Sequence, residues 1–455
     1  MDQLKTDILV IGAGPGGYTA AFEAAKEKLS VVLVDTEHQM GGTCLLKGCI
    51  PSKSLLHIAK LLTEVKDAQS IGIDFGSPKI DLNQVRKWKD SVIDKLGNGL
   101  RMLTKKHGIQ LVQGKASFAD SNSALIEKAG GTKQKIAFTH AIIAAGSQPL
   151  SLGFSTDQSR VMNSTAALNI EDVPQKLLVV GGGYIGLELG TVYAALGSQI
   201  TLVEAASSLL PGVDKDLVNI LQRRLKDTFE DIKLNTKVTG LQGSSATLED
   251  KNGNTSQEEF DKLLVCIGRK PCSDDLGLEN TNVKLDQKGF IQIDSMNQTK
   301  DKNIYAIGDI AGSPMLAHKA VPEGRNAVKA IKKQEALLQS PVIPYVVFTD
   351  PEIAFCGLTE AQAKEKGKDI KVSKFHWIAS GRAMTLNRTD GFTKLIIDPK
   401  TDRILGIAIV GVGAGELISE GVLAVEMGTT TEKLKACIHP HPTLSETIID
   451  AAKHS

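Results

Sequence analysis

Two cysteines in the N-terminal part of the chain, Cys44 and Cys49, are spaced for redox chemistry. In a regular α-helix their Cα atoms would lie about 8.7 Å apart, whereas a disulfide rarely joins Cα atoms more than about 7 Å apart. A bond between them requires a break in the helix, which Gly48 and Pro51 make easy. Because so short a loop removes little entropy from the unfolded chain, the bond would suit a redox switch better than a structural crosslink. The alternative is two unlinked cysteines packed as small apolar side chains.

A second reactive group lies near the C-terminus, where residues 439–446 read His-Pro-His-Pro-Thr-Leu-Ser-Glu. The alternating prolines predict an extended path, and Thr443 with Glu446 has the spacing of a capping box that begins a last helix. A second interpretation takes His441 as a general acid or base and Glu446 as the carboxylate that orients it. The residues alone leave both interpretations open.

These side chains need a scaffold, and the first candidate is a nucleotide-binding unit at the N-terminus. A strand over 7–11 runs into Gly-Ala-Gly-Pro-Gly-Gly, followed by a helix through Glu27 and a second strand from Leu29 that ends in an acid. In this fingerprint the glycines allow a tight turn, the approach of a pyrophosphate and close helix–strand packing, while the acid binds a ribose. The fingerprint residues are Gly12, Gly14, Gly16, Gly17 and Asp35.

The same pattern occurs again in the middle of the chain. A predicted strand over 176–180 precedes Gly-Gly-Gly-Tyr-Ile-Gly, a helix, a strand over 199–203 and an acid, and the first glycine and the acid are 23 residues apart in both copies. Residues 205–208 contain no Arg or Lys, so a 2′-phosphate would meet a carboxylate and no cation, which favours NAD over NADP. The residues assigned to this second site are Gly181, Gly183, Ile185, Gly186 and Glu204.

Further matches between the two copies define the domain organisation. In each copy an apolar strand runs into Gly-x-x-Pro, at Gly146 and Gly268, and a later strand ends in Gly308-Asp309. We therefore expect an α/β fold with two Rossmann-like dinucleotide-binding domains, the second inserted into the first, and an α+β C-terminal domain. The predicted domains are 1–147 with 271–340 for the first, 148–270 for the second and 341–455 for the last.

Bulk composition excludes several classes of function. Of the 455 residues 42% are hydrophobic and 23% are charged, and a net charge of +1 with a pI near 7.6 attracts neither nucleic acid nor an anionic membrane. The apolar run over 177–196 contains the glycine fingerprint and a carboxylate, which argues against a membrane span. The chain enters its first strand without a targeting segment, so we expect a cytoplasmic protein.

The six cysteines are too few for a secreted disulfide scaffold in a chain of this length. Four of them show no C-x-x-C spacing with partner histidines, so we expect reduced thiols and no metal. These four are Cys266, Cys272, Cys356 and Cys437.

Together with Pro-Met-Leu-Ala-His-Lys-Ala over 314–320, these motifs resemble the class I pyridine nucleotide-disulfide oxidoreductases, and most closely their dihydrolipoyl dehydrogenases. The resemblance extends from residue 7 to residue 446. It implies an FAD-containing homodimer, in which the C-terminal domain forms the interface and the tail of one subunit completes the active site of the other. It also implies a redox-active disulfide, with Cys44 reached by the substrate and Cys49 facing the flavin, and His441 as the base.

Glu188 is a lone carboxylate in an apolar helix, where an unpaired charge is costly. The matching position of the first copy is Thr19, so this carboxylate is not part of the fingerprint. The resemblance implies that Glu188 pairs with Lys53 beside the flavin, and the alternative is an exposed glutamate on the helix surface. By the same resemblance, further flavin contacts are Gly42, Thr43, Lys53, Ala116, Gly146, Asp309 and Ala317, and further NAD contacts are Val238 and Gly268.

The implied reaction is the oxidation of protein-bound dihydrolipoyl groups with NAD as electron acceptor. The implied partners are lipoyl domains, supplied in trans by 2-oxo acid dehydrogenase complexes or by the glycine cleavage system. Two alternatives are another disulfide reductase on the same scaffold and a flavin redox sensor or assembly scaffold without turnover, although a sensor needs no positioned base. The chain departs from the family at Leu46, usually Asn, and at Pro440, usually Ala, and Leu46 lies where it would affect the disulfide potential or flavin contacts.

Overall fold

The computed structural model describes residues 3–153, 159–335 and 342–455. It divides into two compact units, each built from segments that are distant in the sequence. The units are Met1–Ser52, Asn83–Leu150 and Gly268–Gln339 for the first, and Lys53–Leu82, Ser151–Ile267 and Ser340–Ser455 for the second. The predicted domain start at residue 1 and the predicted boundary between residues 340 and 341 lie outside the described residues.

The first unit is built around a seven-stranded sheet. Its strands are β1 (Gln3–Ile11), β2 (Val31–Asp35), β3 (Gln110–Gln113), β4 (Lys115–Asp120), β5 (Ser123–Glu127), β6 (Lys133–Ile143) and β17 (Ile304–Ala306). Their order is β3-β2-β1-β6-β5-β4, and β17 pairs with the end of β6. The central strands are parallel and their apolar residues are buried, as expected for a sheet that helices cover. The first strand begins at Gln3, earlier than predicted, because its first residues also pair with β6.

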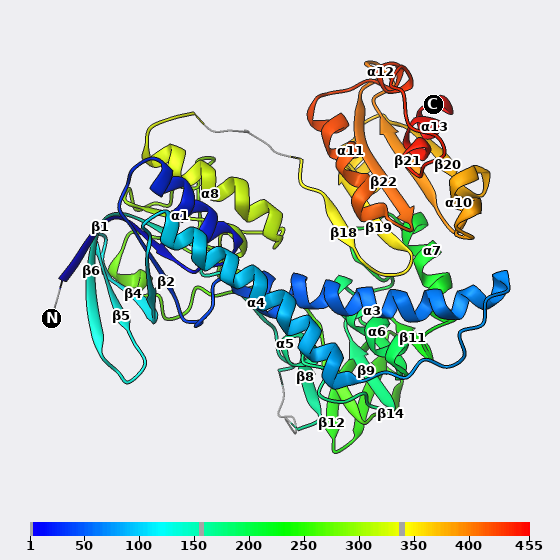
Figure 1. The fold of residues 1–455 in the computed structure, drawn as a ribbon, viewed down its shortest axis with the longest axis horizontal. Helices are drawn as coiled ribbons and strands as arrows, with labels where there is room; N and C mark the ends of the chain where they lie inside the picture. Colours follow the sequence, from blue (N-terminus) through cyan, green and yellow to red (C-terminus); the bar gives the residue numbers. More distant parts are fainter. Residues whose placement is uncertain (1–2, 154–158, 336–341) are drawn as a thin grey trace. The chain divides into compact units, whose positions relative to one another are not determined.

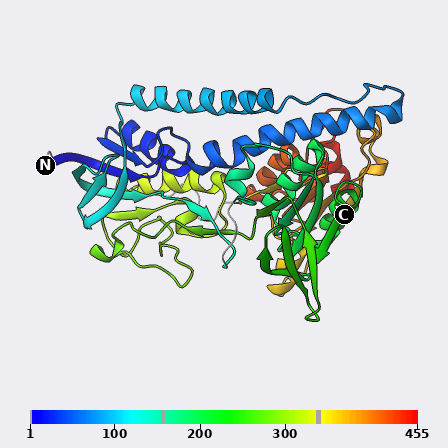
Figure 2. The ribbon, with the colours of Figure 1, turned by 90° about the horizontal axis from the view of Figure 1, so that it is seen from below.

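Helices α1 (Pro15–Lys26) and α8 (Ala317–Ile331) lie side by side in this unit (Figure 1). They approach so closely that a Cβ atom on Gly324 would lie 2.7 Å from the carbonyl oxygen of Gly16, and the glycine makes this approach possible. The unit also contains α2 (Gly42–Lys47) and the 25-residue α4 (Leu82–Lys106), which is seen side-on in Figure 2.

The second unit contains a five-stranded parallel sheet in the order β11-β10-β9-β15-β8. Helix α6 (Tyr184–Leu196) follows β9, and α7 (Lys215–Lys226) follows β10. A separate antiparallel sheet is formed by β12 (Thr236–Gln242), β13 (Ser245–Asp250) and β14 (Thr255–Glu259). The parallel strands are β8 (Val161–Asn163), β9 (Lys176–Val180), β10 (Gln199–Glu204), β11 (Asp231–Leu234) and β15 (Lys262–Val265).

The C-terminal part of the second unit is an antiparallel sheet in the order β18-β19-β22-β21-β20. Helix α11 (Ala414–Glu426) contacts β19 and β22, and α13 (Glu446–Lys453) contacts β20 and β21. The strands are β18 (Tyr345–Val347), β19 (Glu352–Gly357), β20 (Lys371–His376), β21 (Phe392–Ile397) and β22 (Ile404–Gly411).

The predicted α/β architecture is confirmed. The second parallel sheet comes between β6 and β17 in the chain, and these two strands pair, so the second nucleotide unit is an insertion into the first. The strand predicted from Leu29 begins at Val31, and the first helix ends at Lys26 with Glu27 as its C-cap. Residues 177–196 form β9, a glycine turn and α6, and none of the helices in the described residues is long and apolar enough to span a membrane.

Candidate active site

The helix break that a disulfide between Cys44 and Cys49 would require is present. Cys44 lies in α2, and Cys49 begins α3 (Cys49–Asp67). Between them Gly48 has φ −153° and ψ −109°, a non-helical conformation that ends α2 before α3 begins. The sequence argument therefore predicted the local backbone, and the disulfide itself stays a prediction.

The cysteine segment packs against the first glycine turn. A Cβ atom on Gly42, whose φ is +58°, would lie 2.6 Å from the Cα atom of Gly14. The amide of Gly41 donates to the carbonyl of Ala13 over 3.0 Å. Burial first, and the charges of the Cys44 and Cys49 thiolates second, raise the pKa of Tyr18 of α1. The turn that would hold a pyrophosphate and the pair of cysteines thus form one local structure.

The two glycine fingerprints have the same geometry. In the first copy Asp35 Oδ2 accepts from the amide of Ala13 over 2.6 Å, and Oδ1 accepts from the amide of Glu37. In the second copy Glu204 Oε2 accepts from the amide of Gly182 over 2.6 Å, and Oε1 accepts from the amide two residues beyond the acid. Each acid therefore closes the end of its strand against its glycine turn.

The glycines differ in what surrounds them, and the differences fit the binding of dinucleotides. A Cβ atom on Gly12 or Gly181 would lie 2.2 or 2.3 Å from a carbonyl oxygen of the neighbouring strand end. By contrast, Gly183 has nothing within 4 Å of such an atom, and Gly14 has nothing closer than 3.8 Å. The first glycine is thus required by the fold, and the second leaves backbone accessible at a helix N-terminus, where a pyrophosphate binds.

The remaining predicted glycines and Ile185 pack against neighbouring parts of the fold. A Cβ atom on Gly17 or Gly186 would overlap the carbonyl of the first glycine of its own turn, so both permit close packing of helix and strand. Gly16 faces Ala320 of α8, and Ile185 is half-buried in the first turn of α6.

The predicted flavin carboxylate, Asp309, lies in a 3₁₀ turn (Gly308–Ala311) directly after β17. Glu323 of α8 holds this turn, since its Oε2 accepts from the amide of Gly308 over 2.7 Å. Its Oε1 pairs with Lys319 Nζ at 2.8 Å. The sequence reasoning did not assign Lys319 and Glu323, although their i, i+4 spacing on one helix was a signal for an ion pair.

The other predicted cofactor contacts lie in strands and helices or directly before strands. Ala116 is buried in β4, Thr43 is half-buried in α2, and Ala317 begins α8. Gly146 and Gly268 have φ of +75° and +117°, respectively, and Val238 lies at an irregularity of β12. Their roles toward FAD and NAD stay predictions.

Lys53 and Glu188 form an ion pair, with 2.8 Å between Nζ and Oε2. The Glu188 side chain is 4% exposed, so the alternative of an exposed surface glutamate is wrong. Its Oε1 accepts from the amide of Phe348 over 3.0 Å, and Lys53 Nζ lies 4.5 Å from the centre of the Phe348 ring. The buried carboxylate is therefore satisfied at both oxygens, and Phe348 is a partner that no motif indicated.

His441 and Glu446 are also paired, with 2.9 Å between Nδ1 and Oε1. Glu446 Oε2 accepts from the amide of Thr443 over 2.8 Å, as in a capping box. The reciprocal bond of that predicted box is absent among the described residues. Thr443 Oγ1 donates to the Pro440 carbonyl instead, and α13 begins only at Glu446. Glu446 therefore makes one contact that each interpretation expects, and the role of His441 as an acid or base stays a prediction. The imidazole is 79% exposed and presents Nε2 to its surroundings.

Another histidine–carboxylate pair lies close by in the chain. His439 Nε2 is 2.7 Å from Glu420 Oε1, and its Nδ1 is buried without a hydrogen-bond partner. Sequence spacing gave no signal for this pair.

Two of the remaining cysteines are unreactive for a physical reason, since burial raises the pKa of Cys266 and of Cys356 to about 12.

Three carboxylates that were not predicted to meet lie together, with oxygens within 4.8 Å of one another: Asp214, Asp216 and Glu360. The buried Lys394 occupies the space among them, and its Nζ lies 2.7 to 3.0 Å from each. The Lys394 ammonium group neutralises these carboxylates where a metal ion would otherwise do so, and the cluster is therefore an ion-pair network.

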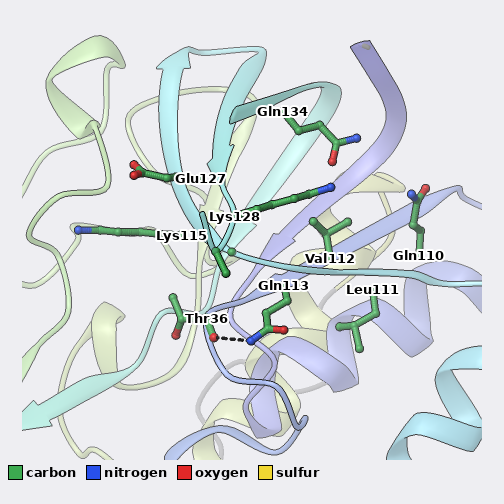
Figure 3. Close-up of a pocket in the computed structure, with 11 residues that line it drawn as sticks. Thr36, Gln110, Leu111, Val112, Gln113, Lys115, Glu127, Lys128 and Gln134 are labelled. Atoms are coloured by element: carbon green, nitrogen blue, oxygen red, sulfur yellow. Dashed lines mark hydrogen bonds between the residues drawn. The ribbon is translucent and has the colours of Figure 1, made fainter. Parts of the chain in front are cut away.

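A cavity of about 890 Å³ lies in the first unit, and Figure 3 shows residues that line it. Thr36 and Lys115 line it, and they are the chain neighbours of Asp35 and Ala116. Gln134 Oε1 is buried there without a partner, and Gln113 Nε2 donates to the carbonyl of Thr36.

Two family models match most of the chain. Residues 6–324 match the model described as pyridine nucleotide-disulphide oxidoreductase, and residues 343–452 match the dimerisation domain of the same family. Among curated proteins, the dihydrolipoyl dehydrogenases of Vibrio parahaemolyticus and Geobacillus stearothermophilus are 42% and 41% identical to this chain. Each comparison covers 99% of this chain and 96% of the relative.

Solved structures share the fold over the same length. LpdA from Mycobacterium tuberculosis has a TM-score of 0.90 at 26% identity, covering 98% of this chain and 99% of that one. The HOCl-induced flavoprotein disulfide reductase RclA of Escherichia coli, solved as a Cu(II) complex, has a TM-score of 0.88 at 29% identity, covering 100% and 99%.

Proposed function

The chain belongs to the pyridine nucleotide-disulphide oxidoreductase family, and we propose that it is the member that oxidises dihydrolipoyl groups with NAD as acceptor. FAD and NAD(H) are the cofactors of this enzyme class, and a dimerisation domain at residues 343–452 makes it a homodimer. The proposal includes the residue roles that follow.

One observation carries the proposal beyond the family. The His441–Glu446 pair holds an imidazole by one nitrogen and leaves the other exposed. A carboxylate can only accept a hydrogen bond, so Nδ1 carries the proton and Nε2 is the basic nitrogen. A base in this state can remove a proton from a thiol, whereas a sensor or scaffold without turnover has no use for it.

The two cysteines take different roles in the proposal. A thiolate of the substrate attacks Cys44, the mixed disulfide resolves to lipoyl disulfide, and Cys44 and Cys49 become the reduced pair. The substrate loses two electrons and two protons in this exchange. The protein disulfide gains the two electrons, one proton passes to His441 Nε2, and the other passes to the Cys44 sulfur. His441 Nε2 takes a proton from the incoming dithiol, which is mostly protonated near neutral pH.

The cofactor sites follow the two fingerprints. The amides at the first glycine turn, with Asp35 and Asp309, would hold FAD, and those at the second turn, with Glu204, would hold NAD. When bound, FAD would supply two-electron redox chemistry between the reduced Cys44–Cys49 pair and NAD. Glu204 repels a 2′-phosphate, so the acceptor is NAD.

The proposed substrate arrives on another protein. We assign the partner as a lipoyl domain of a 2-oxo acid dehydrogenase complex or of the glycine cleavage system, supplied in trans. The tail that carries His441 would serve the cysteines of the other subunit in the dimer.

Steady-state turnover tests the proposal. The FAD-loaded dimer should oxidise dihydrolipoamide with NAD and should show little rate with NADP at equal concentration. Oxidised glutathione with NADPH is the matched assay for a different disulfide reductase. If an FAD-loaded dimer turns over neither dihydrolipoamide nor glutathione, the proposed activity is wrong and the sensor alternative is favoured. If it turns over glutathione alone, the chain is a different disulfide reductase of the family.

A further inference from the structure

The two Gly-x-x-Pro segments, one from each copy of the internal repeat, bind each other. They form the antiparallel strands β7 (Ser147–Pro149) and β16 (Arg269–Pro271). The backbone bonds are reciprocal: the amide of Leu150 donates to the carbonyl of Gly268, and the amide of Cys272 donates to the carbonyl of Gly146, both over 3.0 Å. The chain enters the inserted segment through the first strand and leaves it through the second.

Equivalent positions of this ribbon carry different side chains, and those side chains form a directed relay. Arg269 Nε donates to Ser147 Oγ over 2.8 Å, and Nη2 donates to the Ser147 carbonyl over 2.7 Å. Ser147 Oγ then donates to Asp309 Oδ2 over 2.5 Å. Ser147 and Arg269 each follow the glycine of their own Gly-x-x-Pro segment. In the ribbon Ser147 pairs with Pro271 and Arg269 pairs with Pro149, so the guanidinium reaches Ser147 diagonally across the two strands.

The chemistry of the three groups fixes the direction of the relay. A guanidinium only donates and a carboxylate only accepts, so the single proton of the Ser147 hydroxyl is committed to Asp309. Ser147 is 6% exposed, which shields both charge-assisted bonds from water. The backbone of the Asp309 turn is held separately by Glu323, so this relay acts on the carboxylate itself.

We propose that Arg269 and Ser147 are positioning residues that hold Asp309 for the flavin and link it to the NAD-binding turn at Gly268. The inference rests on the proposed function, since it takes Asp309 as a flavin contact and Gly268 as an NAD contact. A shift at Gly268 when NAD binds moves the adjoining Arg269, and the relay transmits that shift to the carboxylate beside the flavin.

The test uses the dimeric holoenzyme with Arg269→Met, Ser147→Ala and the double variant. Two quantities are measured: the dissociation constant of FAD, and the change in flavin absorbance when NAD is added. We expect each single variant to bind FAD about tenfold more weakly, as for the loss of one charge-assisted hydrogen bond. The NAD-induced absorbance change should shrink in both. The double variant should be no worse than the weaker single variant, because both changes break one chain of bonds.

Controls separate this inference from a general loss of structure. Lys270→Met changes the next residue of β16, whose Nζ pairs with the exposed Asp274, and it should keep wild-type values for both quantities. Arg269→Lys keeps the charge, and we expect it to recover part of the FAD affinity. Wild-type FAD affinity with an unchanged NAD response in Arg269→Met, or additive losses in the double variant, would overturn the relay.

Asp309→Ala distinguishes the two levels of the argument. If it weakens FAD binding while Arg269→Met and Ser147→Ala do not, the relay is wrong and the flavin role of Asp309 stands. If Asp309→Ala leaves FAD binding at its wild-type value, the flavin role of Asp309 fails, and the relay fails with it.

Discussion

At the scale of single residues, the two oxygens of Glu446 hold two different donors. Oε1 faces Nδ1 of His441, and Oε2 accepts from the amide of Thr443. The Thr443 amide first and the imidazole second hold the pKa of Glu446 below its usual value, so the carboxylate stays ionised. One side chain therefore fixes both the tail backbone and the ring that it orients.

We expect Glu446→Gln to impair turnover although it nearly preserves shape. An amide has one acceptor oxygen, so it satisfies either Nδ1–H of His441 or the amide of Thr443, and the ring loses its fixed orientation. The expected fall in kcat with dihydrolipoamide is about 10- to 100-fold, against roughly 10²- to 10⁴-fold for His441→Gln, which removes the base. Flavin absorbance should be unchanged in both variants. Equal kcat for Glu446→Gln and the wild type would show that the carboxylate does not orient the base.

At the scale of elements, the glycine turns and the buried Lys394 differ in how clearly the sequence indicated them. The turn residues were recognisable in the sequence because a fingerprint glycine has a geometric purpose at a fixed offset. Lys394 was not recognisable, because its partners come from α7 and from α9 (Glu360–Glu365), far away in the chain. The same holds for Phe348, which meets Glu188 through a backbone amide that carries no residue-type signal.

The glycine turn of the second site offers a matched pair of substitutions. Gly181→Ala should lower the free energy of unfolding by more than about 1–2 kcal/mol, the cost of a left-handed alanine alone. Its φ is +110°, and the new Cβ atom would lie 2.3 Å from the carbonyl of Cys266. Gly183→Ala adds its methyl group to open space, so the urea midpoint should be kept while KM for NAD rises. An unchanged KM in Gly183→Ala would show that no pyrophosphate approaches that residue.

The ion-pair network around Lys394 predicts that removing the lysine changes how the stability of the protein depends on pH. Burial alone would raise the pKa of Asp216, but hydrogen bonds from Lys374 and Lys394 outweigh it and lower that pKa. A lowered folded-state pKa means that the wild type has this stabilisation above the unfolded value near 3.8 and loses it as the pH falls further.

Lys394→Met leaves the carboxylates crowded, and we expect it to lower the free energy of unfolding by about 3 kcal/mol at pH 7. Protonation then relieves repulsion, so the stability of the variant should rise between pH 7 and pH 5, where the wild-type network changes little. Urea unfolding at the two pH values measures this, with the exposed Lys371→Met as the control. A variant whose stability falls on acidification over this range would refute the account.

At the scale of the whole molecule, the internal repeat made the inserted topology predictable, since two fingerprints with equal spacing imply two parallel sheets. The arrangement of the predicted active site could not be derived in the same way, because its residues come from distant segments and sequence patterns do not show which of them meet. A disulfide between Cys44 and Cys49 would require a break in the helix, and the structure has a break at Gly48. The pairing of Lys53 with Glu188 came from family resemblance, because the two residues are too far apart in sequence for any local rule.

The proposed sharing of sites between subunits gives the last prediction. Homodimers of Cys44→Ser and of His441→Gln should each lack turnover. If each site takes its cysteines from one chain and its base from the other, a hybrid dimer has one intact site and one with both defects. Random exchange makes about half of the dimers hybrids, so the mixture should recover about one quarter of wild-type activity.

The matched control mixes Cys44→Ser with the double variant Cys44→Ser/His441→Gln, in which no dimer contains an intact cysteine pair, and it should recover nothing. Dihydrolipoamide turnover is followed after subunit exchange in dilute urea, with size-exclusion chromatography to establish that dimers have reformed. If each subunit instead contained its own complete site, every site in the mixture would carry one defect, and activity would stay at the level of the separate variants. The recovered fraction therefore decides between the two arrangements.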